Sequence, residues 1–295
     1  MKRIALLGIL LAAGAASIAA QAPATPKVVD ILKLKDNLYV LTSSTPGNVA
    51  TFSGGNVAVF ITDAGVTLVD DKLAGWGQAV LDKVKSVTNK PITRIINTHT
   101  HGDHTGNNGF FGASVEIVAQ ENTKTNMEKM DAFKGDGSKF LPAKTYKDKM
   151  TIGSGKDRID LYYFGAGHTS GDTFVVFPAL RVLHTGDMFA WKDGPLCDRN
   201  NGGSCVALPR SLQKAIAGIK NVDTIIPGHS PMQTPKDLQM YQTFTADLLS
   251  HATTEMKAGR SVDEAVASFK VDKYPGYKNE RVKGSIQAVY DELKK

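Results

Sequence analysis

The sequence predicts an α/β fold in which two β-sheets pack face to face between outer layers of helices. Two observations favour this arrangement. The chain opens with two pairs of apolar runs joined by turn-forming residues, which is typical of antiparallel hairpins. From about residue 77, segments with helical spacing alternate with short apolar runs, and the alternation recurs after residue 158. Strands in two separate sets imply two sheets rather than one.

Each expected element follows from its local pattern. Residues 35–37 and 62–65 are turn formers between apolar runs, so the first four strands form two hairpins. Apolar residues recur at helical spacing from 77 to 87, and short apolar runs later in the chain indicate buried strands. The expected strands are 28–34, 38–42, 56–61, 66–70, 92–96, 114–119, 158–164, 173–177, 181–184 and 222–226. The expected helices are 77–87, 105–111, 211–219, 235–257, 262–269 and 279–293.

Residues 1–22 have the order of an export signal. Lys2 and Arg3 precede an apolar stretch, and small residues up to Ala22 form a cleavage zone. The apolar stretch is shorter than the roughly 20 residues that span a bilayer, which argues against a retained anchor. We therefore expect residues 23–295 to form a single domain. We expect the mature protein to be periplasmic or secreted, with no membrane attachment after cleavage.

The charge pattern argues against a nucleic-acid partner. The formal charge is +6 at pH 7, and two of the basic residues belong to the leader. The chain contains no block rich in lysine and arginine with interleaved aromatic residues, so the basic excess is ordinary surface composition. The expected partner is a small-molecule substrate, and the pattern does not indicate an oligomeric state.

Cys197 and Cys205 are the two cysteines of the chain and bracket a short polar loop. In an exported protein such a pair is expected to form a disulfide rather than a metal or redox site. The loop follows Asp187 closely, so the bridge would stiffen one wall of any site there. Phe189, Trp191 and the segment 140–142 are candidates for apolar walls of the same site, with a position in the core as the alternative.

The segment 97–108 carries three imidazoles and a carboxylate within six consecutive positions, directly after an apolar run. Imidazole nitrogens and carboxylate oxygens are ligands that zinc accepts. Residues two apart in an extended segment point the same way, so His99 and His101 can bind one ion. A tightening of the chain at Gly102 can turn Asp103 and His104 toward a second ion. The spacing therefore predicts two metal ions.

The motif His99-x-His101-x-Asp103-His104 resembles the signature of the metallo-β-lactamase superfamily of hydrolases. Three later stretches, at 167–172, 185–187 and 227–229, fit the same family in the same order. The resemblance runs from about residue 57 to about residue 230. It implies a four-layer αββα sandwich, in agreement with the expected two sheets, but it leaves the substrate open because one fold carries many chemistries.

The resemblance also implies a complete set of metal ligands. The first ion would be held by His99, His101 and His168, the second by Asp103, His104 and His229, and both by a bridging Asp187. Asp103 would also act in catalysis by orienting the nucleophile.

Four further residues are assigned outside the ligand set. Asp70 resembles the family's acidic residue that hydrogen-bonds the histidine-rich loop from behind, and Asp71 is expected to be its solvated neighbour. His184 is expected to be a packing residue or a residue behind the ligands, and His251 an ordinary surface residue.

The implied enzyme is an exported dinuclear zinc hydrolase, with iron or manganese as alternative metals. Zinc lowers the pKa of bound water to about 7, so a hydroxide bridging two ions would attack a carbonyl carbon. The expected substrate has an ester, lactone or thioester-like bond. β-Lactamases with this first motif typically lack an acidic residue where Asp187 stands, so β-lactam hydrolysis is the alternative. A non-catalytic metal-binding protein of the same fold is a third alternative, which the complete ligand set disfavours.

Overall fold

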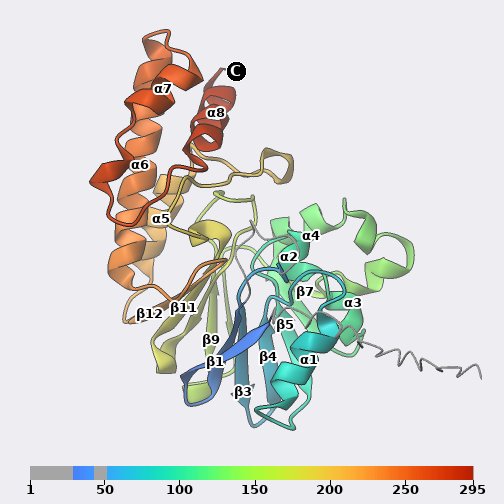
Figure 1. Ribbon diagram of the computed structural model, residues 1–295. Coiled ribbons are helices and arrows are strands. Elements are labelled where there is room, and N and C mark those ends of the chain that lie inside the picture. The colour runs from blue at the N-terminus through green and yellow to red at the C-terminus, as the bar shows by residue number, and fades with distance from the viewer. Residues whose placement is uncertain (1–28, 43–51, 295) are drawn as a thin grey trace, which may run out of the picture.

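Two β-sheets face each other in the computed structural model, which describes residues 29–42 and 52–294 (Figure 1). The expected leader at 1–22 and Val28, the first residue of the first expected strand, lie outside the described residues. The first sheet is hydrogen-bonded in chain order: β1 (Asp30–Lys35), β2 (Leu38–Thr42), β3 (Val57–Thr62), β4 (Gly65–Val69), β5 (Ile92–Ile96), β6 (Glu116–Gln120) and β7 (Lys144–Tyr146). The second sheet has the order β12 (Thr224–Pro227), β11 (Val182–Gly186), β10 (Phe174–Phe177), β9 (Ile159–Tyr162) and β8 (Lys149–Ile152).

The helices lie on the outer faces of the two sheets, except for short ones at the ends of the strands, such as the helix at Gly102–Thr105 (Figure 1). They are α1 (Gly77–Lys85), α2 (Gly102–Thr105), α3 (Asn108–Phe111), α4 (Glu121–Met127), α5 (Leu208–Gly218), α6 (Pro235–Lys257), α7 (Val262–Ser268) and α8 (Val282–Leu293). Helix α1 packs on the first sheet, whereas α5, α6 and α8 pack on the second. The expected αββα sandwich is therefore confirmed.

Three apolar clusters correspond to the three interfaces between the layers. Alternate residues of a strand enter different clusters, because successive side chains point to opposite faces of a sheet. Val57 and Val59 of β3 pack against α1, whereas Ala58 and Phe60 point between the sheets. In the second sheet the inward-facing group includes Phe177, whose ring lies 5.0 Å from that of Phe60. The period-two pattern of the sequence thus produces a core on both faces of each sheet.

Most expected elements are present, with boundaries shifted by a few residues, but β7, β8 and α4 were not predicted. Strands β7 and β8 are short, carry lysine, and lie at the edges of their sheets, where one side of the strand has no partner and the apolar pattern is weak. Helix α4 has a polar sequence rich in asparagine and threonine. The single helix expected at 105–111 is divided into α2 and α3 at Gly106, where a Cβ would lie 2.2 Å from the amide nitrogen of Ala74.

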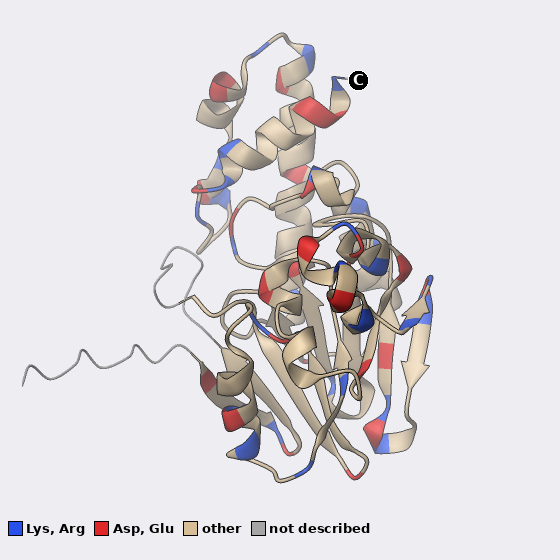
Figure 2. Cartoon of the chain, turned by 90° about the vertical axis from the view of Figure 1, so that its right-hand side faces the viewer, with Lys and Arg blue, Asp and Glu red and all other residues tan. Residues whose placement is uncertain are grey.

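The last part of the chain forms a helical layer that extends beyond the sheets (Figure 1). Helix α6 begins with a capping box between Thr234 and Asp237 and buries Tyr241, Phe244 and Leu248 at helical spacing. Basic and acidic residues are interspersed along these helices (Figure 2). Within the described residues, no helix is long and apolar enough to cross a membrane.

Candidate metal centre

The candidate ligands lie in loops at one end of the two sheets. β4 is parallel to β5, and β11 is parallel to β12, so the carboxyl ends of each pair meet at the same edge. β9 runs in the same direction as β11, since β10 pairs antiparallel with both. The loops after β5, β9, β11 and β12 therefore converge, and they carry the seven residues that the sequence singled out.

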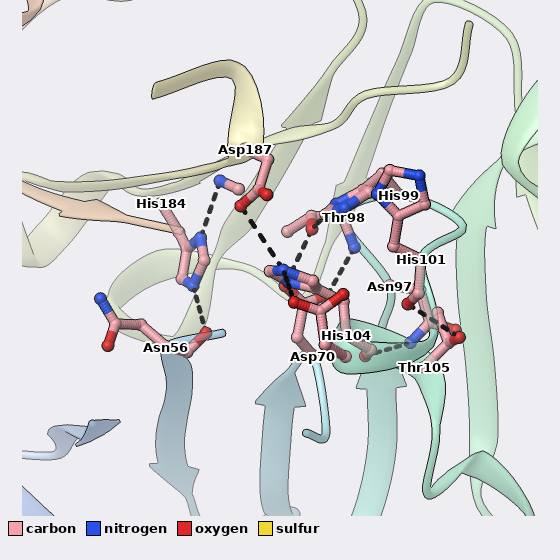
Figure 3. Close-up of polar contacts among 12 residues, drawn as sticks. Asn56, Asp70, Asn97, Thr98, His99, His101, His104, Thr105, His184 and Asp187 are labelled. Atoms are coloured by element: carbon pink, nitrogen blue, oxygen red, sulfur yellow. Dashed lines mark hydrogen bonds and ion pairs between the residues drawn. The ribbon is translucent and has the colours of Figure 1, made fainter. Parts of the chain in front are cut away.

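The histidine-rich segment leaves β5 extended and then forms one helical turn. His101 caps this turn, and its carbonyl accepts hydrogen bonds from the amides of His104 and Thr105 at 3.0 and 3.1 Å. The turn is the expected tightening at Gly102, and it directs His104 away from His101 (Figure 3). One short segment thus supplies side chains to two groups of potential ligands.

The first group consists of His99, His101 and His168, each with one potential ligand atom within 4.8 Å of the others. His168 Nε2 lies 2.8 Å from His101 Nδ1. His99 Nδ1 contacts the hydroxyl of Thr98 at 2.9 Å, and its buried Nε2 has no hydrogen-bond partner among the residues that the structure describes. Three imidazole nitrogens therefore converge, in the combination expected for the first metal.

The second group consists of Asp103, His104 and His229. His229 Nε2 lies 3.3 Å from Asp103 Oδ2 and 3.2 Å from His104 Nε2. The loop that carries His229 is held by Asn56, which directly precedes β3 of the first sheet. The side-chain amide of Asn56 donates to the carbonyls of Pro227 and Ser230 at 2.8 and 2.9 Å. No local pattern around Asn56 predicts this role.

Asp187 lies between the two groups. Its Oδ2 is 3.6 Å from His168 Nε2 and 3.2 Å from His229 Nε2, and its Oδ1 is 3.4 Å from His104 Nε2. The neighbouring loop approaches so closely that a Cβ on Gly228 would lie 1.8 Å from Asp187 Oδ1. A glycine is therefore required at position 228, and the Asp187 carboxylate faces both groups, as a bridging ligand would.

Asp70 supports the histidine-rich loop from below, as expected. The residue is fully buried, and its Oδ1 accepts a hydrogen bond from the backbone amide of Thr98 at 2.7 Å. Its Oδ2 accepts a hydrogen bond from the hydroxyl of Thr98 at 2.8 Å and contacts His104 Nδ1 at 2.7 Å (Figure 3). With Nδ1 engaged in this way, His104 directs Nε2 toward the second group.

The prediction for Asp71 was wrong, because this side chain is buried and not solvated. Asp70 adopts a φ of 66°, which turns the chain beneath the histidine-rich loop, where Asp71 Oδ1 accepts the amide of Asn107 at 2.9 Å. Burial raises the pKa of Asp71. Lys72 is also fully buried, and burial lowers its pKa to about 7 despite the nearby carboxylates of Asp103 and Asp70. Three consecutive charged residues normally indicate a solvated turn, so the sequence pattern was misleading here.

Asp198 is a residue of the site that sequence reasoning missed. Its Oδ2 lies 2.8 Å from His101 Nε2, and its backbone amide donates to the carbonyl of His168 at 2.7 Å. His168 Nδ1 contacts the carbonyl of Leu196 at 2.7 Å. The expected disulfide between Cys197 and Cys205 is confirmed, and it closes this loop. The loop therefore orients two imidazoles of the first group.

Other residues that the sequence singled out are packed within the fold and belong to neither ligand group. His184 is buried, with Nε2 3.1 Å from the carbonyl of Asn56 and Nδ1 accepting the amide of Gly186, which confirms its packing role. His251 is half-buried between helices, 2.7 Å from the carbonyl of Ala265, so the surface prediction was wrong. Phe189 is a core residue and does not form a wall of the site.

The buried carboxylates give the centre a strong preference for positive charge. Burial lowers the pKa of His104, but Asp103, Asp187 and Asp70 outweigh burial and raise it to about 10. Burial likewise disfavours the charged form of His229, yet Asp187 and Asp103 raise its pKa. Protons on these imidazoles compensate the carboxylates, and a bound cation would replace them, so metal binding should release protons.

The residues present fit divalent cations. Within residues 29–42 and 52–294, the buried atoms His99 Nε2 and Asp187 Oδ1 have no hydrogen-bond partner, and both face neighbouring ligand groups. Unpaired buried polar atoms are unfavourable unless they bind a ligand or water. Five imidazoles and two carboxylates are suitable donors for zinc and also for iron or manganese.

Replacing Asp198 with asparagine is expected to lower the affinity of the first group for zinc by about 10- to 100-fold, because His101 loses a charged hydrogen-bond partner. Competitive titration with a chromogenic chelator measures this affinity without reference to activity. Asp263→Asn is the matched control, since Asp263 is exposed and pairs with Lys283 at the surface. Unchanged affinities in Asp198→Asn would contradict the orienting role.

Comparisons with known proteins agree with this geometry. Residues 50–229 match the family model described as the metallo-beta-lactamase superfamily. The chain is 29% identical over 260 residues to the metallo-beta-lactamase type 2 of Elizabethkingia meningoseptica, covering 85% of this chain and 96% of that protein. The chain is also similar to the crystal structure of the DIM-1 metallo-beta-lactamase, with a TM-score of 0.62, 20% identity and coverage of 75% and 98%.

Another solved structure covers a larger share of this chain. The inverting sec-alkylsulfatase Pisa1 from Pseudomonas sp. superimposes with a TM-score of 0.74 at 15% identity, covering 90% of this chain and 50% of that one. At these identities the solved structures show the fold alone. Because the family model spans more than half of the sequence, the chain belongs to the metallo-beta-lactamase superfamily of metal-dependent hydrolases.

Proposed function

We propose that this protein is an exported dinuclear zinc hydrolase that cleaves an ester, lactone or thioester bond of a small molecule. The observation that carries the proposal is the position of Asp187, whose two carboxylate oxygens face imidazoles of both ligand groups. His99, His101 and His168 would hold one ion, and Asp103, His104 and His229 the other. When bound, two such ions would activate water as a nucleophile near neutral pH and polarise the scissile carbonyl.

Asp103 is suited to orient the attacking water. Its side chain is 22% exposed, whereas those of Asp187 and His229 are 6% and 3% exposed, so Asp103 lies on the open side of the centre. Burial raises the pKa of Asp103, but His104 and His229 lower it to about 2. The group is therefore a carboxylate at neutral pH and can accept a hydrogen bond from the water.

Two further observations support export. The order of charged, apolar and small residues at 1–22 is that of a cleavable leader. The bridge between Cys197 and Cys205 is typical of an oxidising compartment such as the periplasm.

β-Lactam hydrolysis is the second candidate, and the similarity to the Elizabethkingia meningoseptica enzyme favours it. Asp187 argues against it. If two ions were bound, the Asp187 carboxylate would add negative charge near both, which would suit leaving groups that depart readily, as in esters, lactones and thioesters. The departing nitrogen of a β-lactam requires more stabilisation or protonation.

We expect the catalytic efficiency of the zinc-loaded mature protein to be at least tenfold higher on some ester or lactone than on any penicillin or carbapenem. A tenfold ratio corresponds to about 1.4 kcal/mol of transition-state stabilisation. The measurement is kcat/KM across a panel of β-lactams, lactones, thioesters, and phosphate and sulfate esters. If kcat/KM for a carbapenem exceeded kcat/KM for every ester and lactone, the protein would be a β-lactamase instead.

A further inference from the structure

A cavity of about 370 Å³ opens beside the candidate metal centre, on the side of the second ligand group. Trp191 and Lys192 form one side, His229 reaches it from the centre, and Lys278 and Arg281 line it from the segment that precedes α8. This segment follows the residues matched by the family model, which end at 229. The cavity therefore combines the shared centre with a part of the chain outside the family match.

His229 connects the cavity to the centre. Its Nε2 lies 3.3 Å from Asp103 Oδ2 and 3.2 Å from Asp187 Oδ2, and its ring centroid lies 5.7 Å from that of Trp191. A small molecule that occupied the cavity would therefore contact the tryptophan ring while one end reached the second ligand group.

Arg281 is fixed at the cavity by both its side chain and its backbone. The guanidinium carbon lies 4.1 Å from the centroid of the Trp191 ring, within cation–π distance. The Arg281 amide donates to Asp193 Oδ1 at 3.2 Å, and the Lys278 amide donates to the carbonyl of Lys192 at 2.9 Å. The segment that carries Arg281 is thus tied to the loop that carries Trp191.

The other two cations of the cavity are already paired. Lys192 Nζ lies 2.7 Å from Asp237, and Lys278 Nζ lies 3.2 Å from Glu280. In the described part of the chain, no carboxylate lies within ion-pair distance of the Arg281 guanidinium. A guanidinium stacked on an aromatic ring keeps the N–H groups at its edge available for a planar anion.

We propose that Arg281 binds a carboxylate at the far end of the substrate while Trp191 contacts its apolar body. The substrate is then a small ester, lactone or thioester that carries a free carboxylate separate from the scissile bond. This inference rests on the proposed function for the reaction, but its binding step can be tested without turnover.

The kinetic test compares 4-carboxyphenyl acetate with its neutral analogue 4-carbamoylphenyl acetate on the zinc-loaded protein. Arg281→Gln should reduce kcat/KM for the carboxylate ester at least tenfold, mainly through a higher KM, and change kcat/KM for the neutral ester less than twofold. Arg281→Lys keeps the charge but not the planar edge, so its loss should be intermediate. Lys283→Ala is the matched control, because Lys283 pairs with Asp263 at the surface and does not line the cavity; it should leave the ratio unchanged.

A binding test separates this inference from the proposed function. Isothermal titration of the zinc-loaded protein should show that 4-hydroxybenzoate binds at least tenfold more tightly than 4-hydroxybenzamide, and that Arg281→Gln removes the preference. Selective binding without ester turnover would refute the proposed function and retain the carboxylate site. Ester turnover with the same carboxylate preference in wild type and Arg281→Gln would overturn the carboxylate site and retain the function.

Discussion

Replacing Asp187 with asparagine is expected to reduce bound zinc from two ions per chain to one or fewer and to lower kcat/KM at least a thousandfold. Asparagine keeps the shape of the side chain but removes the charge that faces imidazoles of both ligand groups. A thousandfold loss corresponds to about 4 kcal/mol in the activation barrier. Elemental analysis of purified protein gives the stoichiometry, and steady-state kinetics on the best ester gives kcat/KM.

The matched control is Asp223→Asn. Asp223 is a half-exposed carboxylate next to the start of β12, at the opposite end of the second sheet, where it pairs with Arg181. This variant should keep two ions and full activity. His104→Ala should remove one ion, since His104 belongs to the second ligand group. A wild-type protein that saturated at one zinc, with the same stoichiometry in His104→Ala, would show that the centre is mononuclear.

Asp70→Asn is expected to lower the free energy of unfolding of the metal-free protein by about 3 kcal/mol. The carboxylate is fully buried, and it accepts hydrogen bonds from the backbone and hydroxyl of Thr98 and contacts His104. An amide can accept through only one of its two terminal atoms, so one donor is left unpaired. Urea denaturation measures the change. Zinc affinity should fall about 10- to 100-fold as well, because His104 loses the partner that fixes its orientation.

Asp63→Asn serves as the control for this change. Asp63 has an 89% exposed side chain and pairs with Lys90 at the surface, so its removal should alter neither stability nor zinc affinity measurably. An Asp70→Asn protein as stable as the control, with unchanged zinc affinity, would show that the buried carboxylate does not organise the centre.

The fold was predictable because its central strands have strong local patterns. Strands such as β3 and β5 are apolar and bounded by turn residues, and α6 has both a capping box and helical apolar spacing. The edge strands β7 and β8 were missed because an edge strand needs less apolar surface. The division of the helix after residue 101 depends on the close approach of another loop at Gly106, which no local pattern encodes.

The sequence by itself determined which residues could form the centre. His99, His101, Asp103 and His104 are neighbours in the chain, and their spacing directs them to two groups wherever the strand before them ends in a tight turn. The disulfide was predictable in the same way, since its two cysteines are close in sequence. Short separations make these outcomes insensitive to the rest of the fold.

Only the tertiary structure decided which residues surround the centre. Asp198 approaches His101 across 97 positions of the chain, and Asn56 reaches the His229 loop across more than 170. Asp71 and Lys72 are buried because the histidine-rich loop covers them, and Arg281 meets Trp191 because the segment before α8 returns to the site. Such contacts depend on how loops pack at the ends of the sheets. The hydrogen-bonding capacity of a side chain is local, but the identity of its partner is set by the packing of distant segments.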